Sequence, residues 1–167
     1  MGFVLITVPC GKEEAAKLEV LDCVLPQDQN ARFMEHGYGG LLLLDTVLSP
    51  DDAAVVLRDC PTSSVFKIIP VDSMVNSDIA AISREAVRLT GEGRRRVAAV
   101  CKRRGRVIAS SSEVEVAVGR ALKSRGHIID LKNPELIIRI DIIGKRTTIS
   151  VRPPSGFFTK LRGGEGD

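Results

Sequence analysis

Runs of Lys and Arg are the residues of this sequence whose types and spacing most clearly predict a chemistry. Three groups follow one another in the second half: "GRRR" at 93–96, "KRRGR" at 102–106, and a helical stretch with Arg120, Lys123 and Arg125. Lys132 and Asn133 follow in the segment "DLKNP". Clustered guanidinium and ammonium groups contact phosphate oxygens, with an affinity that falls as salt rises. The pattern therefore indicates a polyanion-binding surface.

The two halves of the chain differ in charge, which strengthens this interpretation. Residues 1–75 contain 5 Lys or Arg against 11 Asp or Glu, a net of −6, whereas residues 76–167 contain 19 against 10, a net of +9. RNA is the favoured polyanion, since no basic amphipathic helix carries the bulky apolar anchors of a membrane-surface helix. The candidate RNA-binding residues are Arg95, Arg96, Lys102, Arg103, Arg104, Arg106, Arg120, Lys123, Arg125, Lys132 and Asn133.

These residues form a single patch only if the "KRRGR" turn, the basic helix and the "DLKNP" loop meet in space. We expect the side chains of Lys102 and Arg104 to be exposed, so that reversing their charges weakens RNA binding without unfolding. In the second half, Phe157 and Phe158 are the only aromatic residues. This argues against a binder that stacks bases on aromatic rings and favours reading RNA by its shape, ends and backbone.

Signals of catalysis are absent from the sequence. "GEGRRR" is not a phosphate loop of the GxxxxGK[ST] kind, and no dinucleotide-binding motif or metalloprotease motif occurs. His36 and His127 lie in no recognisable nucleophile context, and His127 is predicted to be a loop or partly buried histidine rather than a metal ligand. The cysteines are scattered without a CxxC pair, which predicts small apolar core residues: Cys10, Cys23, Cys60 and Cys101. We expect a non-catalytic protein that uses no metal and no cofactor.

Composition predicts a soluble, cytoplasmic protein with an aliphatic core. The chain is 44% hydrophobic but only 4% aromatic, so its core must consist of Val, Ile, Leu and Ala. A run of about 18 apolar residues, the length that spans a bilayer, does not occur.

The first half reads as strands and helices in the order β-α-β-β-α-β, the ferredoxin-like pattern. The expected strands are 3–8, 31–35, 40–45 and 65–71, and the expected helices are 12–23 and 50–58. The second helix has a clear start, because Ser49 is a good N-cap and Pro50 suits the first turn. We assign residues 1–73 to this ferredoxin-like domain.

The second half begins after a linker, "PVDSMVNSD" at 70–78. Helices are expected at 77–89 and 112–125, and strands at 95–102, 136–143 and 146–152. In strand 136–143, Ile138 and Ile140 alternate with Arg139 and Asp141, so the two kinds of side chain face opposite sides of the sheet. We expect a small α/β domain of two helices on a short sheet at 77–153 and a flexible tail at 154–167. The fold class is therefore α+β.

Two segments of the second half resemble the THUMP domain, an RNA-binding module of tRNA-modifying proteins. They are "RVAAVCKRRGRVIASSSEVEVAVGRAL" and "HIIDLKNPELIIRIDIIG", and the likeness covers roughly residues 77–152. The resemblance implies tRNA binding, often near the acceptor end, with Lys102, Arg103 and Arg104 in the basic turn, Arg120 and Lys123 on the helix, and Lys132 and Asn133 in the loop as contacts. It also implies that Asp130 and Pro134 shape the loop.

Families with this module usually carry a catalytic domain after it, and we expect the 15 residues after Arg152 to be too few for one. The chain is most similar to stand-alone THUMP proteins related to the eukaryotic adaptor of tRNA cytidine acetylation. This resemblance implies a non-catalytic protein that presents tRNA to a separate modifying enzyme, with an acetyltransferase favoured.

Three other functions stay open at this point. In the second, the chain is an RNA-binding subunit or fragment of a tRNA sulfur-transfer (4-thiouridine) system, which predicts the same RNA binding with a different partner. A third possibility is a small-molecule hydrolase, because a ferredoxin-like fold can use Arg and Asn to hydrolyse acyl phosphates. In the fourth, the basic half binds a protein with an acidic surface.

Overall fold

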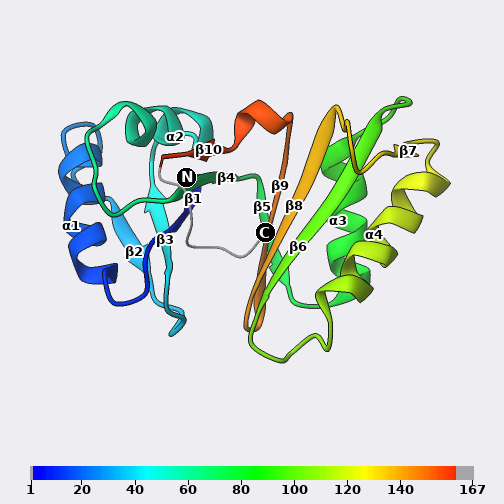
Figure 1. Ribbon diagram of the computed structural model, residues 1–167, viewed down its shortest axis with the longest axis horizontal. Helices are drawn as coiled ribbons and strands as arrows, with labels where there is room; N and C mark the ends of the chain where they lie inside the picture. The colour runs from blue at the N-terminus through cyan, green and yellow to red at the C-terminus, as the bar shows by residue number, and fades with distance from the viewer. Residues whose placement is uncertain (1, 161–167) are drawn as a thin grey trace. The chain divides into compact units, whose positions relative to one another are not determined.

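The computed structural model describes residues 2–160 of the 167-residue chain and divides it into two compact units (Figure 1). Unit 1 comprises residues 1–71 and the segment that begins at Gly156, and unit 2 comprises Asp72–Ser155. The chain thus leaves unit 1 once and returns to it. Within residues 2–160, no helix is both long and apolar enough to cross a membrane.

Unit 1 has the β-α-β-β-α-β order that the sequence predicts, and its sheet runs β10-β4-β1-β3-β2 with antiparallel neighbours. The Ser49 side chain accepts a hydrogen bond from the Asp52 N–H at 3.1 Å, which confirms the predicted cap. The elements are β1 (Gly2–Thr7), α1 (Glu13–Val24), β2 (Arg32–Met34), β3 (Leu41–Thr46), α2 (Pro50–Asp59), β4 (Lys67–Val71) and β10 (Phe158–Thr159).

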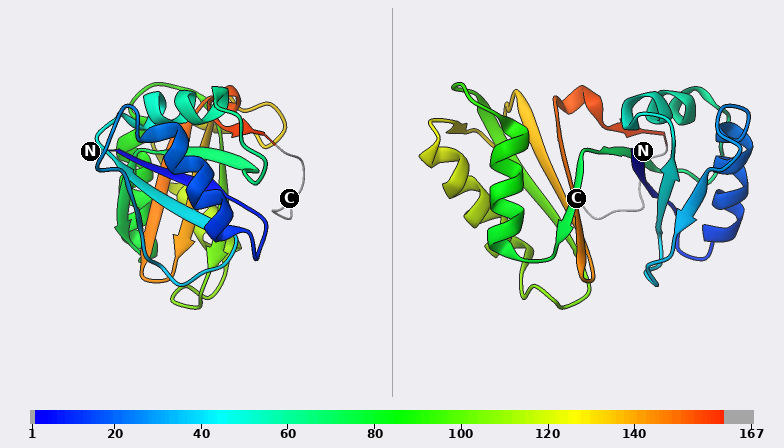
Figure 2. Two further views of the ribbon diagram at one scale, coloured as in Figure 1. Left: turned by 90° about the vertical axis from the view of Figure 1, so that its left-hand side faces the viewer. Right: turned by 180° about the vertical axis from the view of Figure 1, so that it is seen from behind.

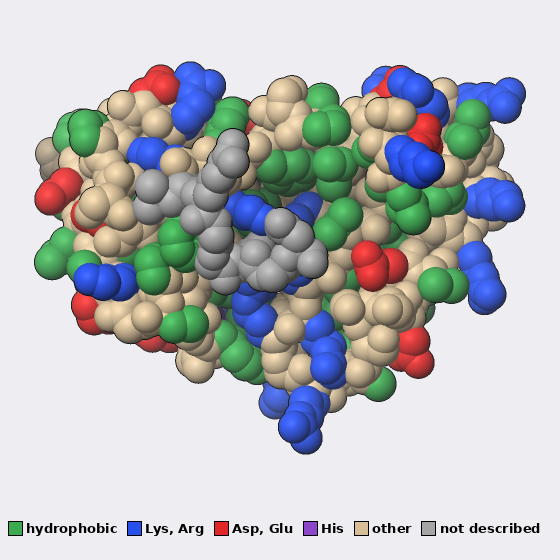
Figure 3. Space-filling view, viewed as in Figure 1, with side chains coloured by type: hydrophobic (Ala, Val, Ile, Leu, Met, Phe, Trp, Pro, Cys, Tyr) green, Lys and Arg blue, Asp and Glu red, His purple; other side chains and the backbone are tan. Residues whose placement is uncertain are grey.

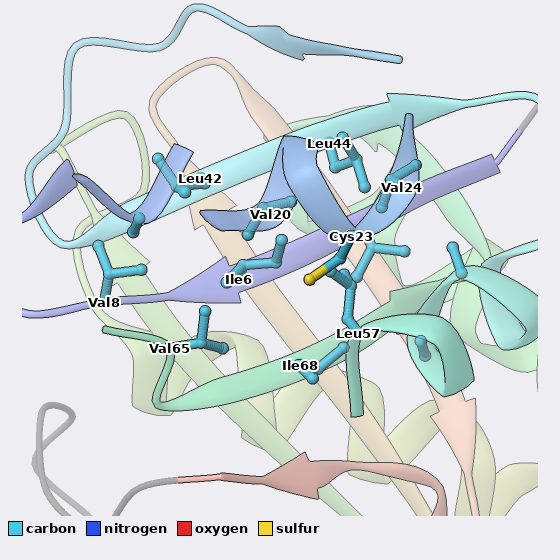
Figure 4. Packing of buried hydrophobic residues seen from close by; sticks show 14 residues of the cluster. Ile6, Val8, Val20, Cys23, Val24, Leu42, Leu44, Leu57, Val65 and Ile68 are labelled. Carbon is cyan, nitrogen blue, oxygen red and sulfur yellow. The ribbon is translucent and has the colours of Figure 1, made fainter. Parts of the chain in front are cut away.

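The core of unit 1 lies between its two helices and its sheet, where aliphatic side chains such as Ile6, Val20 and Leu57 converge (Figure 4). Cys23 on α1 and Cys60 after α2 form a disulfide there. The expectation that all four cysteines are simple core residues is therefore wrong for this pair. It is also wrong for Cys10, which is exposed, whereas Cys101 is buried as expected.

The return segment contradicts the expected flexible tail where the structure describes it. After a short helical turn at Pro154–Gly156, β10 pairs with β4, with Phe158 opposite Ile68, and forms an edge of the sheet. The Lys160 ammonium then donates hydrogen bonds to the backbone carbonyls of Leu57 and Cys60 at the end of α2. A cation at this position satisfies carbonyls that the helix leaves without partners. Residues 161–167 of the predicted tail lie outside the described residues.

Unit 2 consists of two helices packed on one face of a five-stranded sheet, in the order β5-β9-β8-β6-β7 (Figure 2). The face of β8 that meets the helices carries Ile138, Ile140 and Ile142, which pack with Val114, Val118 and Leu122 from α4. This confirms the alternation read from the sequence. The elements are β5 (Ser73–Asn76), α3 (Ile79–Thr90), β6 (Arg96–Arg104), α4 (Ser111–Ser124), β7 (Ile128–Ile129), β8 (Leu136–Ile143) and β9 (Arg146–Arg152).

The predicted linker is instead part of unit 2. Its residues 73–76 form β5, which pairs with β9 at the edge of the sheet. Asp72 accepts hydrogen bonds from the Val151 N–H and from the Arg152 guanidinium, at 2.7 and 2.6 Å. A period-two pattern is weak in a strand of four residues, so only the pairing with β9 reveals it.

Candidate nucleic-acid interface

Strand β6 separates the basic residues of unit 2 into two groups. Arg96 at its start pairs with Ile128 of β7, and Arg104 at its end pairs with Ile143 of β8. Eight residues of extended chain span about 26 Å. We call the group at the start the helix-end cluster: Arg94, Arg95, Arg96, Arg120, Lys123, Arg125 and Lys132. We call the group at the end the hairpin-end cluster: Lys102, Arg103, Arg104, Arg106, Lys145 and Arg146.

The parallel pairing of β6 and β8 causes this separation. The "DLKNP" loop precedes β8, so the Asp130 and Glu135 N–H groups donate to the carbonyls of Val97 and Arg96 near the start of β6. Helix α4 runs back along β6 and ends beside the same loop. The "KRRGR" turn lies at the opposite end, beside the β8–β9 turn, where the Gly144 N–H donates to the Arg104 carbonyl. Figure 3 shows Lys and Arg side chains at both ends of unit 2. The condition for a single patch is therefore not met.

At the hairpin end, two predicted RNA contacts have structural partners. The Arg103 guanidinium donates to the carbonyls of Ile108 and Ala109 at 3.1 and 2.9 Å, which holds the turn before α4. The Arg104 guanidinium donates to the Asp141 carboxylate at 3.2 Å and its side chain is only 18% exposed. The expectation that Arg104 is exposed is wrong, and Lys102 is half-buried.

Asp141 is the centre of a buried ion network. Besides Arg104, it binds Arg139 through two hydrogen bonds of 2.9 and 3.0 Å, and the Asp141 side chain is 1% exposed. Arg139 and Asp141 project from β8 on the face opposite Ile138, as the sequence pattern predicts. Both lie on a sheet face where an unpaired charge is costly.

An Asp141→Asn variant is expected to lose about 3 kcal/mol of unfolding free energy, because it leaves two guanidinium groups without their carboxylate. The measurement is urea denaturation followed by far-UV circular dichroism. The matched control is Glu135→Gln, which removes an exposed pair with Arg96 and should cost less than about 1 kcal/mol. Equal costs for the two variants would contradict a buried network.

At the helix end, the "DLKNP" loop is shaped by Asp130. Its carboxylate accepts hydrogen bonds from the N–H groups of Lys132 and Asn133, at 3.1 and 3.0 Å. The Asn133 N–H in particular lowers the pKa of Asp130, so the carboxylate stays charged. The side chains of Lys132 and Asn133 are left exposed at the tip of the loop.

His127 fixes the neighbouring loop at 91–95. Its Nε2 atom lies 3.1 Å from the Gly91 carbonyl oxygen, and its Nδ1 atom accepts a hydrogen bond from the Arg95 N–H at 3.3 Å. The side chain is 3% exposed. As the sequence predicts, it is a buried loop histidine, and both ring nitrogens are used within unit 2.

A hollow of about 450 Å³ opens between α4, β7 and the "DLKNP" loop. Its walls are apolar at Val116, Ile129 and Leu131, and Leu131 is 75% exposed. Arg120 and Lys123 line its rim. Exposed aliphatic side chains gathered in one place are typical of a binding site. These apolar residues were not among the sequence-based candidates, although "HIIDL" at 127–131 contains Ile129 and Leu131.

Two further arginines were outside the sequence-based candidates. Arg84 and Arg88 project from α3 one helical turn apart and line a second hollow with Arg125. The signal for them was their spacing of four residues on the polar side of the predicted helix. The structure thus brings Arg95, Arg96, Arg120, Lys123, Arg125, Lys132 and Asn133 to one end of unit 2 and leaves Lys102, Arg103, Arg104 and Arg106 at the other.

Residues 2–160 contain no group of three or more His, Cys, Asp or Glu placed to hold a metal ion. Burial raises the pKa of the Cys101 thiol to about 12, with the nearby Asp141 and Glu115 adding to the effect. A thiol of this kind is inert at neutral pH.

The comparison with protein families identifies the same part of the chain, unit 2, that carries the basic clusters. Residues 78–152 match the model of the THUMP domain, whereas no curated protein matches the chain. Among solved structures, PH1313 from Pyrococcus horikoshii Ot3 superimposes with a TM-score of 0.73 at 19% sequence identity, covering 95% of this chain and 55% of that one. TrmN from Thermus thermophilus gives 0.64 at 22% identity, covering 92% and 47%.

A 4-thiouridine synthetase, solved as an RNA complex with bound ATP, gives a TM-score of 0.64 at 10% identity, covering 95% of this chain and 42% of that one. At these identities the likeness establishes the fold. The chain spans about half the length of these structures, between 42% and 55%. The residues that match the THUMP model include the "DLKNP" loop, strand β8 and the basic helix α4. Residues 78–152 therefore form a domain that matches the THUMP family.

Proposed function

We propose that this protein binds tRNA through the helix-end cluster and presents its acceptor end to a separate tRNA-modifying enzyme. The observation that carries the proposal is the apolar hollow rimmed by Arg120 and Lys123, with Lys132 on the adjoining loop. Unpaired nucleotides have an apolar base and a charged phosphate. The hollow accommodates a base, and the basic rim lies where the phosphates of the same strand pass.

The proposal assigns no catalytic step to the chain. Unit 1 carries the acidic charge of the first half, which suits contact with a basic protein surface better than contact with RNA. We assign it to docking the partner enzyme, for which the resemblance favours a cytidine acetyltransferase. The second candidate is a subunit of a 4-thiouridine system, and the likeness to the 4-thiouridine synthetase over 95% of this chain supports it. Both candidates share the tRNA-binding step and differ in the enzyme that co-purifies.

The test is binding of the protein to one mature tRNA and to the same tRNA without its 3′ single-stranded end, over a range of salt. If four to six phosphates are contacted, log affinity falls against log salt with a slope of roughly −3 to −5. Removing the 3′ end should weaken binding roughly five- to a hundredfold, since each lost base contact contributes about 1–3 kcal/mol.

Two variants separate the parts of the site. Leu131→Asp should weaken binding of the intact tRNA only, because it places a carboxylate at the hollow. Lys123→Glu should also weaken binding of the intact tRNA, because the phosphates at this rim belong to the unpaired strand, and it should reduce the salt slope for that RNA by about one. Leu18→Asp is the matched control, since Leu18 is 67% exposed and lies in unit 1. A slope near zero, or equal binding of both RNAs by the unmodified protein, would contradict the proposal.

A further inference from the structure

A groove between α3 and α4 is the feature of unit 2 that the proposed site leaves unused. It encloses about 860 Å³ and is lined by Ser83, Arg84, Val87 and Arg88 of α3, by Ala121, Ser124 and Arg125 from α4 and its end, and by the loop 91–93. Arg84, Arg88 and Arg125 are exposed. Arg88 pairs with Glu85 on its own helix. The groove adjoins the helix-end cluster, because Arg125 belongs to both.

The arginines at and beside the groove carry more positive charge than the helix ends and the nearby carboxylates neutralise. Both helices end at this groove, and each helix C-terminus carries about half a negative charge, so the two together amount to about −1. Three arginines line the groove, namely Arg84, Arg88 and Arg125, and Arg94 and Arg95 follow its lining loop directly in the sequence. Together these five arginines oppose the charge of the helix ends and of the Glu85 and Glu92 carboxylates. The remainder is a positive charge of about two, which is available to an anionic ligand.

The loop that closes the groove is held in place and leaves room for a ligand. His127 binds Gly91 and the Arg95 N–H, as described above, so both ends of the loop are pinned. Gly91 and Gly93 have φ values of 77° and 106°, and a Cβ at either position would meet nothing within 4 Å. A polymer backbone can therefore approach this loop closely.

We propose that the α3–α4 groove binds the sugar-phosphate backbone of a paired region of the RNA whose unpaired end occupies the hollow beside α4. Arg84 and Arg88 lie one turn apart, with Cβ atoms separated by about 6 Å, and so contact neighbouring phosphates of one strand. The hydroxyl group of Ser83 suits the same backbone. This inference rests on the proposed function and adds a second, sequence-independent contact to it.

The test is an Arg84→Ala/Arg88→Ala variant of the full chain, with affinity measured for the intact tRNA and for the tRNA without its 3′ end. Both affinities should fall by the same factor, roughly tenfold, and the salt slope should decrease by about two. The matched control is Lys12→Ala/Arg58→Ala, which removes two positive charges from unit 1 and should leave both affinities unchanged. Far-UV circular dichroism checks that each variant is folded.

Each other outcome has a distinct meaning. Unchanged affinities and slope, with the 3′-end preference intact, overturn the groove as an RNA site and leave the proposed function standing; an acidic protein surface would then be its ligand. Loss of binding confined to the intact tRNA also overturns the inference, because the groove would hold the unpaired end. Absence of salt-dependent tRNA binding in the unmodified protein contradicts the proposed function itself.

Discussion

An Ile138→Asp variant is expected to lose the folded THUMP unit while unit 1 keeps its structure. Ile138 lies at the centre of the sheet, with Ala99 of β6 on one side and Val151 of β9 on the other, and is fully buried. A carboxylate there has no cation and no water, and the packing of the isoleucine is lost as well. The cost is about 4 kcal/mol or more, a large part of the stability of a small domain.

The aromatic content of the chain makes this outcome measurable. Tyr38 is the one tyrosine and there is no tryptophan, so tyrosine fluorescence reports on unit 1, whereas far-UV circular dichroism reports on both units. The variant should lose part of its ellipticity and keep the Tyr38 unfolding transition. Val107→Asp is the matched control, because Val107 is 54% exposed. Retention of the full ellipticity and of tRNA binding by Ile138→Asp would contradict the assigned core.

Removal of the disulfide by a Cys23→Ala/Cys60→Ala double substitution is expected to destabilise unit 1 by about 4 kcal/mol. The bond joins residues 37 positions apart. Opening a loop of this length gives the unfolded chain more conformational entropy, which stabilises the unfolded state by about 4 kcal/mol at 25 °C. Cys60 also caps the end of α2, where its carbonyl accepts a hydrogen bond from the Lys160 ammonium. The loss should therefore weaken the attachment of the return segment.

The measurement is urea denaturation followed by Tyr38 fluorescence, for the oxidised protein, the protein with reductant and the double variant. The last two should share one midpoint, well below the first. Cys10→Ala is the control and should match the oxidised protein, since Cys10 is a free, exposed cysteine. Unit 2 contains neither of the bonded cysteines, and its unfolding should not change. Identical midpoints with and without reductant would show that the bond does not stabilise unit 1.

Much of the fold can be predicted from local patterns. The strand at 136–143 alternates between aliphatic and charged residues, and the structure places those two sets on opposite faces. Ser49 caps its helix because a short polar side chain before Pro50 suits only that position. The β-α-β-β-α-β order follows in the same way, since helical and strand periods differ and breakers separate them. The segments 73–76 and 158–159 escaped prediction because strands of four and two residues contain too little pattern.

The candidate site was predictable in its residue types and not in its geometry. The sequence by itself determined that the second half is basic, that its aromatic residues are few, and that a polar loop with Asn133-Pro134 precedes a strand. Only the tertiary structure decided that Arg104 belongs to the Asp141 network, that Cys23 meets Cys60, and that Lys102 and Lys132 lie at opposite ends of β6. The physical reason is that charge and periodicity are properties of neighbouring residues, whereas strand pairing and helix direction decide which distant residues share a surface.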